Sequence, residues 1–232
     1  MQFLGCMAEE AVVPASSCVK VDDDTPMDRA ALVGCGVTTG VGAAFNTAEV
    51  TPGSTVAVFG CGGIGLSIIQ GARIAGAKQI IAVDLADNKL EMAKSFGATD
   101  TINGGDGLAV MKIHEMTGGG VDFSFEAVGH PELMSQTYDA CRRKGTAVIV
   151  GVGKLTDSFP INALMVSMSG KILKGSMYGD ANPHVDFPML LALYKQGKLE
   201  QFKLLLDPLV ELEAQGALYD QFGTEPAVKT QF

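Results

Sequence analysis

The sequence has no tryptophan, only three histidines, and fewer basic than acidic side chains. Its 232 residues include 17 lysines and arginines against 26 aspartates and glutamates, for a formal net charge of −9. Because an acidic surface repels phosphate backbones and anionic lipid headgroups, this balance argues against nucleic acid or a membrane as a partner. No apolar run reaches the roughly 18 residues that span a bilayer, so no membrane association is expected.

Cysteine is scarce and irregularly spaced, without any CxxC pair. An odd number of scattered cysteines does not suggest a disulfide framework, so a reducing cytoplasm is the expected location. Residues 1–14 contain two glutamates and no basic residue, unlike a secretory signal. The five cysteines are Cys6, Cys18, Cys35, Cys61 and Cys141.

What the chain does contain is an alternation of short apolar runs with helical patterns that end in glycine. This order predicts a parallel sheet with helices on both faces, and the α/β, doubly wound, six-stranded Rossmann fold is the leading topology. Strands are expected at 55–60, 79–84, 98–103, 121–129, 146–153 and 170–179. Helices are expected between them at 63–76, 86–97, 107–120 and 131–145.

The two ends of the chain do not follow this alternation. Residues 1–50 hold an extended run and then a helical stretch before the first strand. Near the other end, residues 186–198 and 209–222 have helical patterns. The expected organisation is part of another domain at 1–36, a nucleotide-binding domain at 37–185 and C-terminal helices at 186–232.

A glycine-rich turn follows the first expected strand and opens the first helix. The stretch Gly60-Cys61-Gly62-Gly63-Ile64-Gly65 fits the pattern G-x-G-x-x-G, which alone is weak because glycine is common in turns of other α/β folds. Here an acid, Asp84, also ends the second strand, 19 positions after Gly65. Strand, helix and acid together predict a dinucleotide site.

Each part of this motif has a physical reason. Gly60 permits a tight turn, Gly62 lets a pyrophosphate approach the backbone, and Gly65 lets helix and strand pack closely. The start of the helix offers free N–H groups and the positive end of its dipole to the phosphates. Asp84 would accept hydrogen bonds from the adenosine ribose and repel a 2′-phosphate, which favours NAD over NADP. Lys89 could reach the same ribose, and a plain surface acid is the alternative interpretation of Asp84.

Three stretches resemble zinc-containing medium-chain alcohol dehydrogenases. They are GCGVTTGVGAAFNTAEVTPGSTVAVFGCGGIGLS (34–67), GGVDFSFEAVG (119–129) and VIVGV (148–152), and the likeness runs from about Phe3 to about Lys198. The resemblance implies an oxidoreductase that oxidises an alcohol to an aldehyde or ketone with NAD. It also implies that residues 1–36 are a remnant of a GroES-like catalytic domain, to which the C-terminal helices partly return.

The resemblance implies roles for individual residues as well. Cys35 matches the third protein ligand of the catalytic zinc, Thr39 a residue that packs against the nicotinamide ring, and Ile64 an apolar residue on its other side. The remaining matches are Val128 at the adenine site, Val152 and Tyr178, whose backbone would hold the carboxamide, and Lys229 near the pyrophosphate. Without the resemblance, Cys35 would be a small hydrophobe, Thr39 a packing hydroxyl, and the apolar residues ordinary core.

A complete zinc site is not expected in this chain. A catalytic zinc needs three protein ligands and one open position. In the family, the other two ligands, the structural-zinc cysteines and the proton-relay hydroxyl lie before the region where this chain begins. His114, His130 and His184 are expected to be surface or cap residues. The chain is therefore expected to be a truncated form that binds NAD and is inactive alone, with zinc bound by the full-length parent.

Other functions compete with an NAD-dependent alcohol dehydrogenase. They are a non-catalytic NAD(H)-binding module, a zinc-free medium-chain reductase and, remotely, a nucleotide-dependent enzyme such as a methyltransferase. Cys35 and Asp84 argue against the zinc-free reductase. The expected substrate is a small alcohol or aldehyde. A homodimer or homotetramer is expected, because the family pairs its sixth strand, here near 170–178, with that of a partner, and Lys171 and Lys174 would supply charge at that edge.

Overall fold

A six-stranded parallel sheet forms the centre of the protein, as the alternation of apolar runs predicts. The computed structural model describes residue 10 and residues 12–199. The strand order is β3-β2-β1-β4-β5-β6, so the winding of the chain reverses between β1 and β4. This confirms the doubly wound Rossmann fold. The strands are β1 Thr55–Phe59, β2 Gln79–Asp84, β3 Asp100–Asn103, β4 Val121–Glu126, β5 Cys141–Ile149 and β6 Ile172–Gly175.

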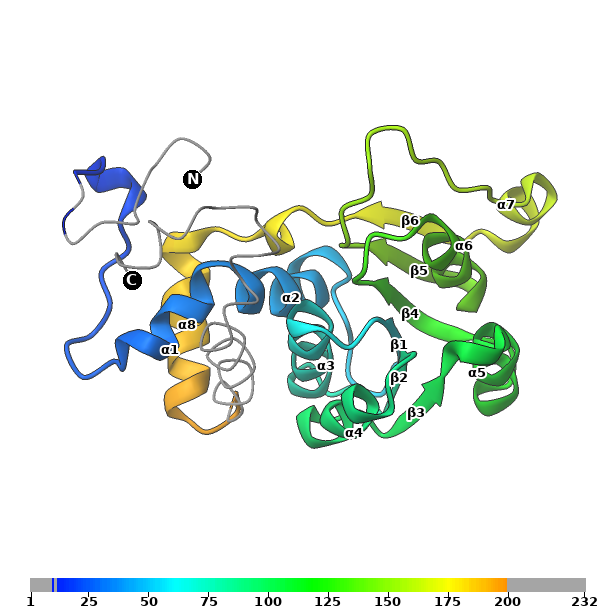
Figure 1. Ribbon diagram of the computed structural model, residues 1–232, viewed down its shortest axis with the longest axis horizontal. Helices are drawn as coiled ribbons and strands as arrows, with labels where there is room; N and C mark the ends of the chain where they lie inside the picture. The colour runs from blue at the N-terminus through cyan, green and yellow to red at the C-terminus, as the bar shows by residue number, and fades with distance from the viewer. Residues whose placement is uncertain (1–9, 11, 200–232) are drawn as a thin grey trace, which may run out of the picture.

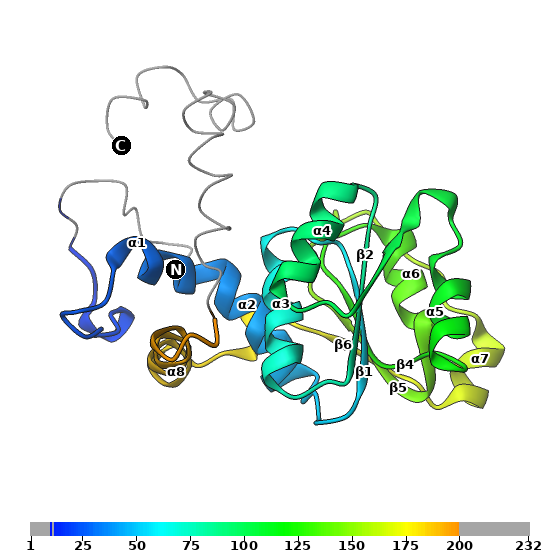
Figure 2. The same cartoon turned by 90° about the horizontal axis from the view of Figure 1, so that it is seen from below.

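Helices cover both faces of the sheet. In Figure 2, α3 and α4 lie on one side of it and α5 and α6 on the other. Strand β1 is buried at every position, and its side chains alternate between the two faces. Val56 and Val58 join the hydrophobic cluster under α3 and α4, whereas Ala57 and Phe59 join the cluster under α5 and α6. These helices are α3 Gly63–Ile74, α4 Asp87–Phe96, α5 Ala109–Thr117 and α6 Pro131–Ala140.

The boundary between α6 and β5 differs from the sequence prediction. The helical pattern extends to residue 145, but α6 ends at Ala140 and β5 begins at Cys141. Strand pairing is the reason, because Cys141 lies opposite Val121 and the Nε of Arg142 donates to Asp122 Oδ1 over 2.6 Å. Contacts with β4 thus override the local helical pattern of 141–145.

The segments around β6 also differ from the pattern. Helix α7 Ala163–Ser169 is not predicted, and it begins where Asn162 Oδ1 accepts from two backbone N–H groups. Helix α8 Pro183–Lys195 begins three residues before the expected helix, with proline in its first turn. The expected helix at 209–222 and Lys229 lie outside the described residues. The short 3₁₀ turns are η1 Ala15–Ser17, η4 Gly104–Asp106 and η5 Tyr178–Asp180.

A long helical stretch precedes the sheet (Figure 1). Its side chains Val33 and Val37 pack with Leu190 and Leu191 of α8 in a separate hydrophobic cluster. The predicted domain boundary at residue 36 falls inside this stretch and stays a prediction. The stretch consists of α1 Met27–Leu32, the π-helical turn η2 Val33–Val37, α2 Thr38–Gly42 and the π-helical turn η3 Ala43–Thr47.

Part of this stretch differs from the expectation that no apolar run is long enough to span a bilayer. Residues Arg29–Thr47 form a 19-residue helix with a mean hydropathy of 1.2, which meets the requirement by length and composition alone. Inside the fold, 56% of this window is buried. A helix packed in a protein interior needs the same composition, so the helix is weak support for a membrane span.

Helix α2 crosses α3 at close range because small residues face each other. A Cβ atom on Gly40 would lie 2.5 Å from the carbonyl oxygen of Ile64 and would overlap Ser67. A Cβ atom on Gly71 would lie 3.0 Å from that of Ala44. Glycine at these positions therefore sets the distance between the long helical stretch and α3.

We expect Gly40→Ala to lower the free energy of unfolding by about 1–3 kcal/mol, because overpacking a tight contact forces side chains or backbone to move. Gly34→Ala is the matched control, since a Cβ there meets nothing within 4 Å. In a helix alanine is favoured over glycine by roughly 0.5–1 kcal/mol, so the control should be neutral or stabilising. Urea denaturation measures both variants, and equal destabilisation would contradict the close approach of α2 and α3.

Candidate cofactor-binding site

The glycine-rich turn lies between β1 and α3, at the carboxyl edge of the sheet, where the winding reverses. Gly60 has a φ of +95°, a conformation that favours glycine, and its N–H donates to Val83 O over 2.8 Å. A Cβ atom on Gly65 would overlap the carbonyl oxygen of Gly60. Helix α3 therefore begins this close to β1 only with glycine at position 65.

The first turn of α3 carries no side-chain cap. Gly62 is its N-cap residue, and a Cβ atom on Gly62 would meet nothing within 4 Å. Gly62 and Gly63 are exposed, and Ile64 is half-buried against the core under α3. Free N–H groups and the positive end of the helix dipole attract anions at such a terminus. The turn thus fits the pyrophosphate of a dinucleotide.

Asp84, at the end of β2, is tied to the glycine-rich turn. Its Oδ2 accepts from Cys61 N over 2.8 Å, and its Oδ1 accepts from Leu85 N and Ala86 N over 2.8 and 3.1 Å. The carboxylate therefore holds two loops together, a role that the sequence alone does not indicate. Lys89 is exposed in the first half of α4, the helix that follows Asp84.

Cys61 is a buried thiol within the turn. Burial raises its pKa to about 12, and the negative charge of Asp84 adds to this shift while Lys89 opposes it. At neutral pH the side chain is therefore a protonated small hydrophobe rather than a nucleophile or metal ligand.

Apolar side chains are exposed along the same edge of the sheet. Val128 lies against the turn, because a Cβ atom on Gly60 would overlap its Cγ2, and its side chain is 55% exposed. Val152, after β5, is 87% exposed, and Leu85, directly after Asp84, is 73% exposed. Val128 and Val152 are therefore not ordinary core residues. Leu85 was missed in the sequence, where the signal is an apolar residue that follows the acid at the end of the second strand.

Glu126 is a second residue that the sequence analysis missed. It ends β4, lies opposite Phe59 of β1 and Ile149 of β5, and is fully buried. Its Oε1 accepts backbone N–H groups from the loop that carries Val128. The available signal was an acid at the end of an otherwise largely apolar strand.

The other predicted residues lie on the long helical stretch and on η5. Cys35 is exposed, Thr39 is buried, and the hydroxyl of Tyr178 donates to Gly34 O over 2.6 Å. Partial burial raises the pKa of the Tyr178 phenol, and the nearby Cys35 adds to the shift. Tyr178 thus brings η5 to the side of Cys35, and the contact of Gly40 with α3 connects this region to the glycine-rich turn.

A complete metal site is not formed by the described part of the chain. Residues 10 and 12–199 contain no group of three histidine, cysteine, aspartate or glutamate side chains that could hold an ion. His114 Nε2 lies 2.9 Å from Asp139 O and His184 Nε2 lies 3.2 Å from Ser16 O, while His130 precedes α6. Cys35 therefore lacks partner ligands among these residues, and zinc does not fit them.

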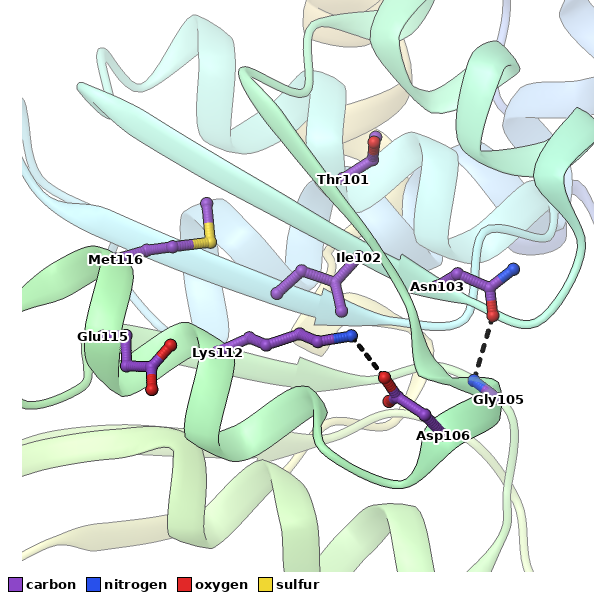
Figure 3. Close-up of a pocket in the computed structure, with 8 residues that line it drawn as sticks. All are labelled: Thr101, Ile102, Asn103, Gly105, Asp106, Lys112, Glu115 and Met116. Atoms are coloured by element: carbon purple, nitrogen blue, oxygen red, sulfur yellow. Dashed lines mark hydrogen bonds and ion pairs between the residues drawn. The ribbon is translucent and has the colours of Figure 1, made fainter.

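A hollow of about 510 Å³ lies elsewhere, at the edge strand β3 and helix α5 (Figure 3). Two of its charged side chains are paired with each other, with Lys112 Nζ 2.7 Å from Asp106 Oδ2, and Asn103 Oδ1 accepts from Gly105 N over 3.0 Å. None of the predicted site residues lines it. The candidate cofactor site is therefore the carboxyl edge around the glycine-rich turn rather than this hollow.

Comparisons with known proteins agree with this geometry. The family model for zinc-binding dehydrogenases matches residues 63–196. S-(hydroxymethyl)glutathione dehydrogenase of Saccharomyces cerevisiae is 40% identical over 220 residues, which cover 90% of this chain and 57% of that protein. Alcohol dehydrogenase-like 5 of Arabidopsis thaliana is 42% identical over 201 residues, 85% of this chain and 51% of that protein. The chain spans about half the length of these curated relatives.

Solved structures give the same result. Benzyl alcohol dehydrogenase of Acinetobacter calcoaceticus superposes with a TM-score of 0.80 at 36% identity, covering 88% of this chain and 57% of that one. An alcohol dehydrogenase zinc-binding domain protein of Burkholderia ambifaria also has a TM-score of 0.80, at 37% identity, with 88% and 55% covered. The chain therefore belongs to the zinc-binding dehydrogenase family, of which it carries the coenzyme-binding part.

Proposed function

We propose that this chain binds NAD and forms the coenzyme-binding part of an alcohol dehydrogenase. The observation that carries the proposal is the uncapped start of α3 at the point where the sheet reverses its winding, with Asp84 bonded to the same turn. The relatives named as alcohol and S-(hydroxymethyl)glutathione dehydrogenases support alcohol oxidation by the whole protein. When bound, NAD supplies the acceptor for the hydride that leaves the alcohol carbon.

The predicted residues would contact different parts of the cofactor and together orient it. The pyrophosphate would meet the backbone at Gly62, Gly63 and Gly65, and the adenosine would lie by Asp84 and Val128. Exposed Leu85 suits the adenine ring, since an apolar surface beside a base is covered when the base binds. The nicotinamide end would be held by Thr39, Ile64, Val152 and Tyr178.

For the chain by itself we propose cofactor binding without turnover. Cys35 would be one zinc ligand in the whole protein, but a catalytic zinc needs three, and the described residues offer no such group. The same observation supports the alternative of a non-catalytic NAD(H)-binding module. A zinc-free reductase would instead be marked by turnover that requires neither metal nor Cys35.

The first experiment adds NAD, zinc and a panel of primary alcohols, aryl alcohols and a formaldehyde–thiol adduct to the purified 232-residue chain. We expect no NADH absorbance to develop, whereas NADH fluorescence titration should show saturable binding. Gly62→Ala should weaken that binding by about tenfold without unfolding the chain, because its Cβ would occupy open space where the phosphates approach the backbone. Gly34→Ala is the control.

Other results of this experiment would refute parts of the proposal. Turnover that Cys35→Ala abolishes would show that the chain assembles a metal site. Turnover that survives both Cys35→Ala and a chelator would favour the zinc-free reductase. Failure of the unsubstituted chain to bind NADH would remove the proposed function altogether.

Cofactor preference is a separate prediction. A zinc-binding dehydrogenase of Sinorhizobium meliloti, 29% identical with a TM-score of 0.65, is bound to NADP, so family membership alone does not decide the cofactor. We expect NADH to bind at least about tenfold more tightly than NADPH, because the charge of Asp84 repels a 2′-phosphate. Asp84→Asn keeps one oxygen that can accept from Cys61 N–H, but it removes the charge. It should therefore lower the ratio of NADH affinity to NADPH affinity. Glu91→Gln, an exposed acid on α4, should leave it unchanged.

We also propose that the protein self-associates through β6. The lysines expected to charge this edge are engaged elsewhere, since Lys171 Nζ donates to Tyr138 O over 3.0 Å and Lys174 Nζ donates to Thr47 O over 2.7 Å. An edge strand that exposes apolar side chains, and whose nearby lysine ammonium groups are bonded to backbone carbonyls of the same chain, favours pairing with another chain. The exposed apolar residues of α7 and β6 are Leu164, Met165, Val166, Met168, Ile172 and Leu173.

Sedimentation equilibrium should therefore detect a dimer or tetramer of the purified chain. Leu173→Asp, which places a charge in the edge strand, should shift the protein to the monomer and leave NADH binding within about threefold of its original value. Leu108→Asp, at an exposed leucine near α5, is the matched control and should not change the mass. A monomer at all concentrations would refute self-association.

A further inference from the structure

Glu126 occupies an unusual position for a carboxyl group. It is fully buried at the carboxyl end of β4, in the centre of the sheet between Phe59 of β1 and Ile149 of β5. Within the described part of the chain, no ion pair to a lysine, arginine or histidine is recorded for it. Burial of a carboxyl group is unfavourable unless hydrogen bonds compensate for the lost hydration. The hydrogen bonds of Glu126 therefore indicate its role.

One carboxyl oxygen of Glu126 accepts hydrogen bonds from three successive backbone N–H groups. Val128 N, Gly129 N and His130 N donate to Oε1 over 2.9, 2.7 and 3.3 Å. These residues form the whole connection between β4 and the first turn of α6, apart from Ala127. The carboxyl group therefore fixes the path of the loop in which Val128 lies against Gly60.

The backbone of Glu126 holds the neighbouring loop as well. Its carbonyl oxygen accepts from Val150 N over 2.9 Å and from Gly151 N over 3.1 Å, just before exposed Val152. A Cβ atom on Gly129 would overlap the backbone of Val152, so the two loops touch. Glu126 thus lies beneath both loops that carry exposed valines at the carboxyl edge.

The second carboxyl oxygen indicates that the Glu126 carboxyl group does not serve mainly to stabilise the fold. Oε2 is buried and has no partner among the described residues, and a Cβ atom on Gly151 would lie 2.6 Å from it. An unsatisfied buried oxygen destabilises the fold relative to an apolar side chain of the same size. The bonds of Oε1 are the compensating feature that a hydrophobic residue could not supply.

We infer that Glu126 is a positioning residue of the cofactor site, which presets the 127–130 loop so that Val128 meets the adenosine half of the bound dinucleotide. This inference rests on the proposed NAD binding. It differs from the roles assigned to Asp84 and the glycines because Glu126 lies beneath the surface and acts through Val128. A loop that is already ordered loses little conformational entropy when the cofactor binds. Loss of the Glu126 carboxyl group should therefore weaken the affinity for NADH.

The test compares three variants of the 232-residue chain. Glu126→Leu fills the same space without an acceptor, Glu126→Gln keeps an acceptor in place of Oε1, and Glu115→Gln is an exposed control on α5. We expect Glu126→Leu to raise the dissociation constants of both NADH and ADP-ribose by about tenfold or more. ADP-ribose lacks nicotinamide, so an equal effect on both ligands excludes the nicotinamide ring and locates the damage in the part of the cofactor that contains the adenosine. Glu126→Gln should restore both constants to within about threefold of the original.

Hydrogen exchange of the cofactor-free protein separates this inference from the proposed function. Glu126→Leu should speed exchange of the amides of Val128 and Gly129 by roughly tenfold, because each loses its acceptor, while Glu126→Gln should not. Unchanged exchange in Glu126→Leu would refute the inference even if NADH binds. A Glu126→Leu chain that fails to fold, beside a folded Glu126→Gln chain, would also refute it and assign Glu126 to stability. If Glu126→Leu speeds this exchange but the unsubstituted chain does not bind NADH, Glu126 still orders the loop. Only its role in cofactor binding would then be refuted.

Discussion

The site depends on how closely helix α3 approaches the end of strand β1. A side chain at position 65 would overlap the carbonyl oxygen of Gly60, so the free N–H groups of the first turn reach the carboxyl edge only with glycine there. Gly40 imposes a similar condition from the other side, where α2 crosses α3 at Ile64 and Ser67. Both contacts meet in the first turns of α3. One short segment of helix therefore sets the distance from β1 and from the stretch that carries Thr39.

Asp84, which we propose sets the cofactor preference, also fixes the shape of the turn. Its two oxygens accept three backbone N–H groups, from Cys61, Leu85 and Ala86. An ionised carboxylate has about four lone-pair sites, so these bonds leave capacity for a ribose hydroxyl. The same group can thus stabilise the loops and select against a 2′-phosphate. Removal of the whole side chain would confound the two effects, whereas Asp84→Asn removes the charge and keeps one of the two acceptor oxygens.

The sequence predicts what local patterns determine. Strands β1 and β2 and the glycine turn follow from apolar runs and glycine spacing, because burial on both faces of a parallel sheet leaves a strong signal. The end of α6 is not predictable in this way, since Val121 and Asp122 of another strand decide it. Leu85 and Glu126 lie next to predicted features, but their roles depend on exposure and on bonds that only the folded chain shows. The placement of the predicted site residues against a cofactor remains a prediction.

The two halves of the site depend on different kinds of contact. The glycine turn is held by bonds to the end of the neighbouring strand β2, 23 residues away, whereas the region of Cys35 is held by bonds between parts of the chain more than 130 residues apart. Tyr178 and Gly34, joined by one of these, are 144 residues apart, and Asn46 Nδ2 donates to Gly179 O over 3.1 Å. These bonds fix the helix that carries Cys35 to η5. If Cys35 binds zinc in the whole protein, the position of this one ligand is set by the fold of the coenzyme-binding part, and the remaining ligands have to be brought to it.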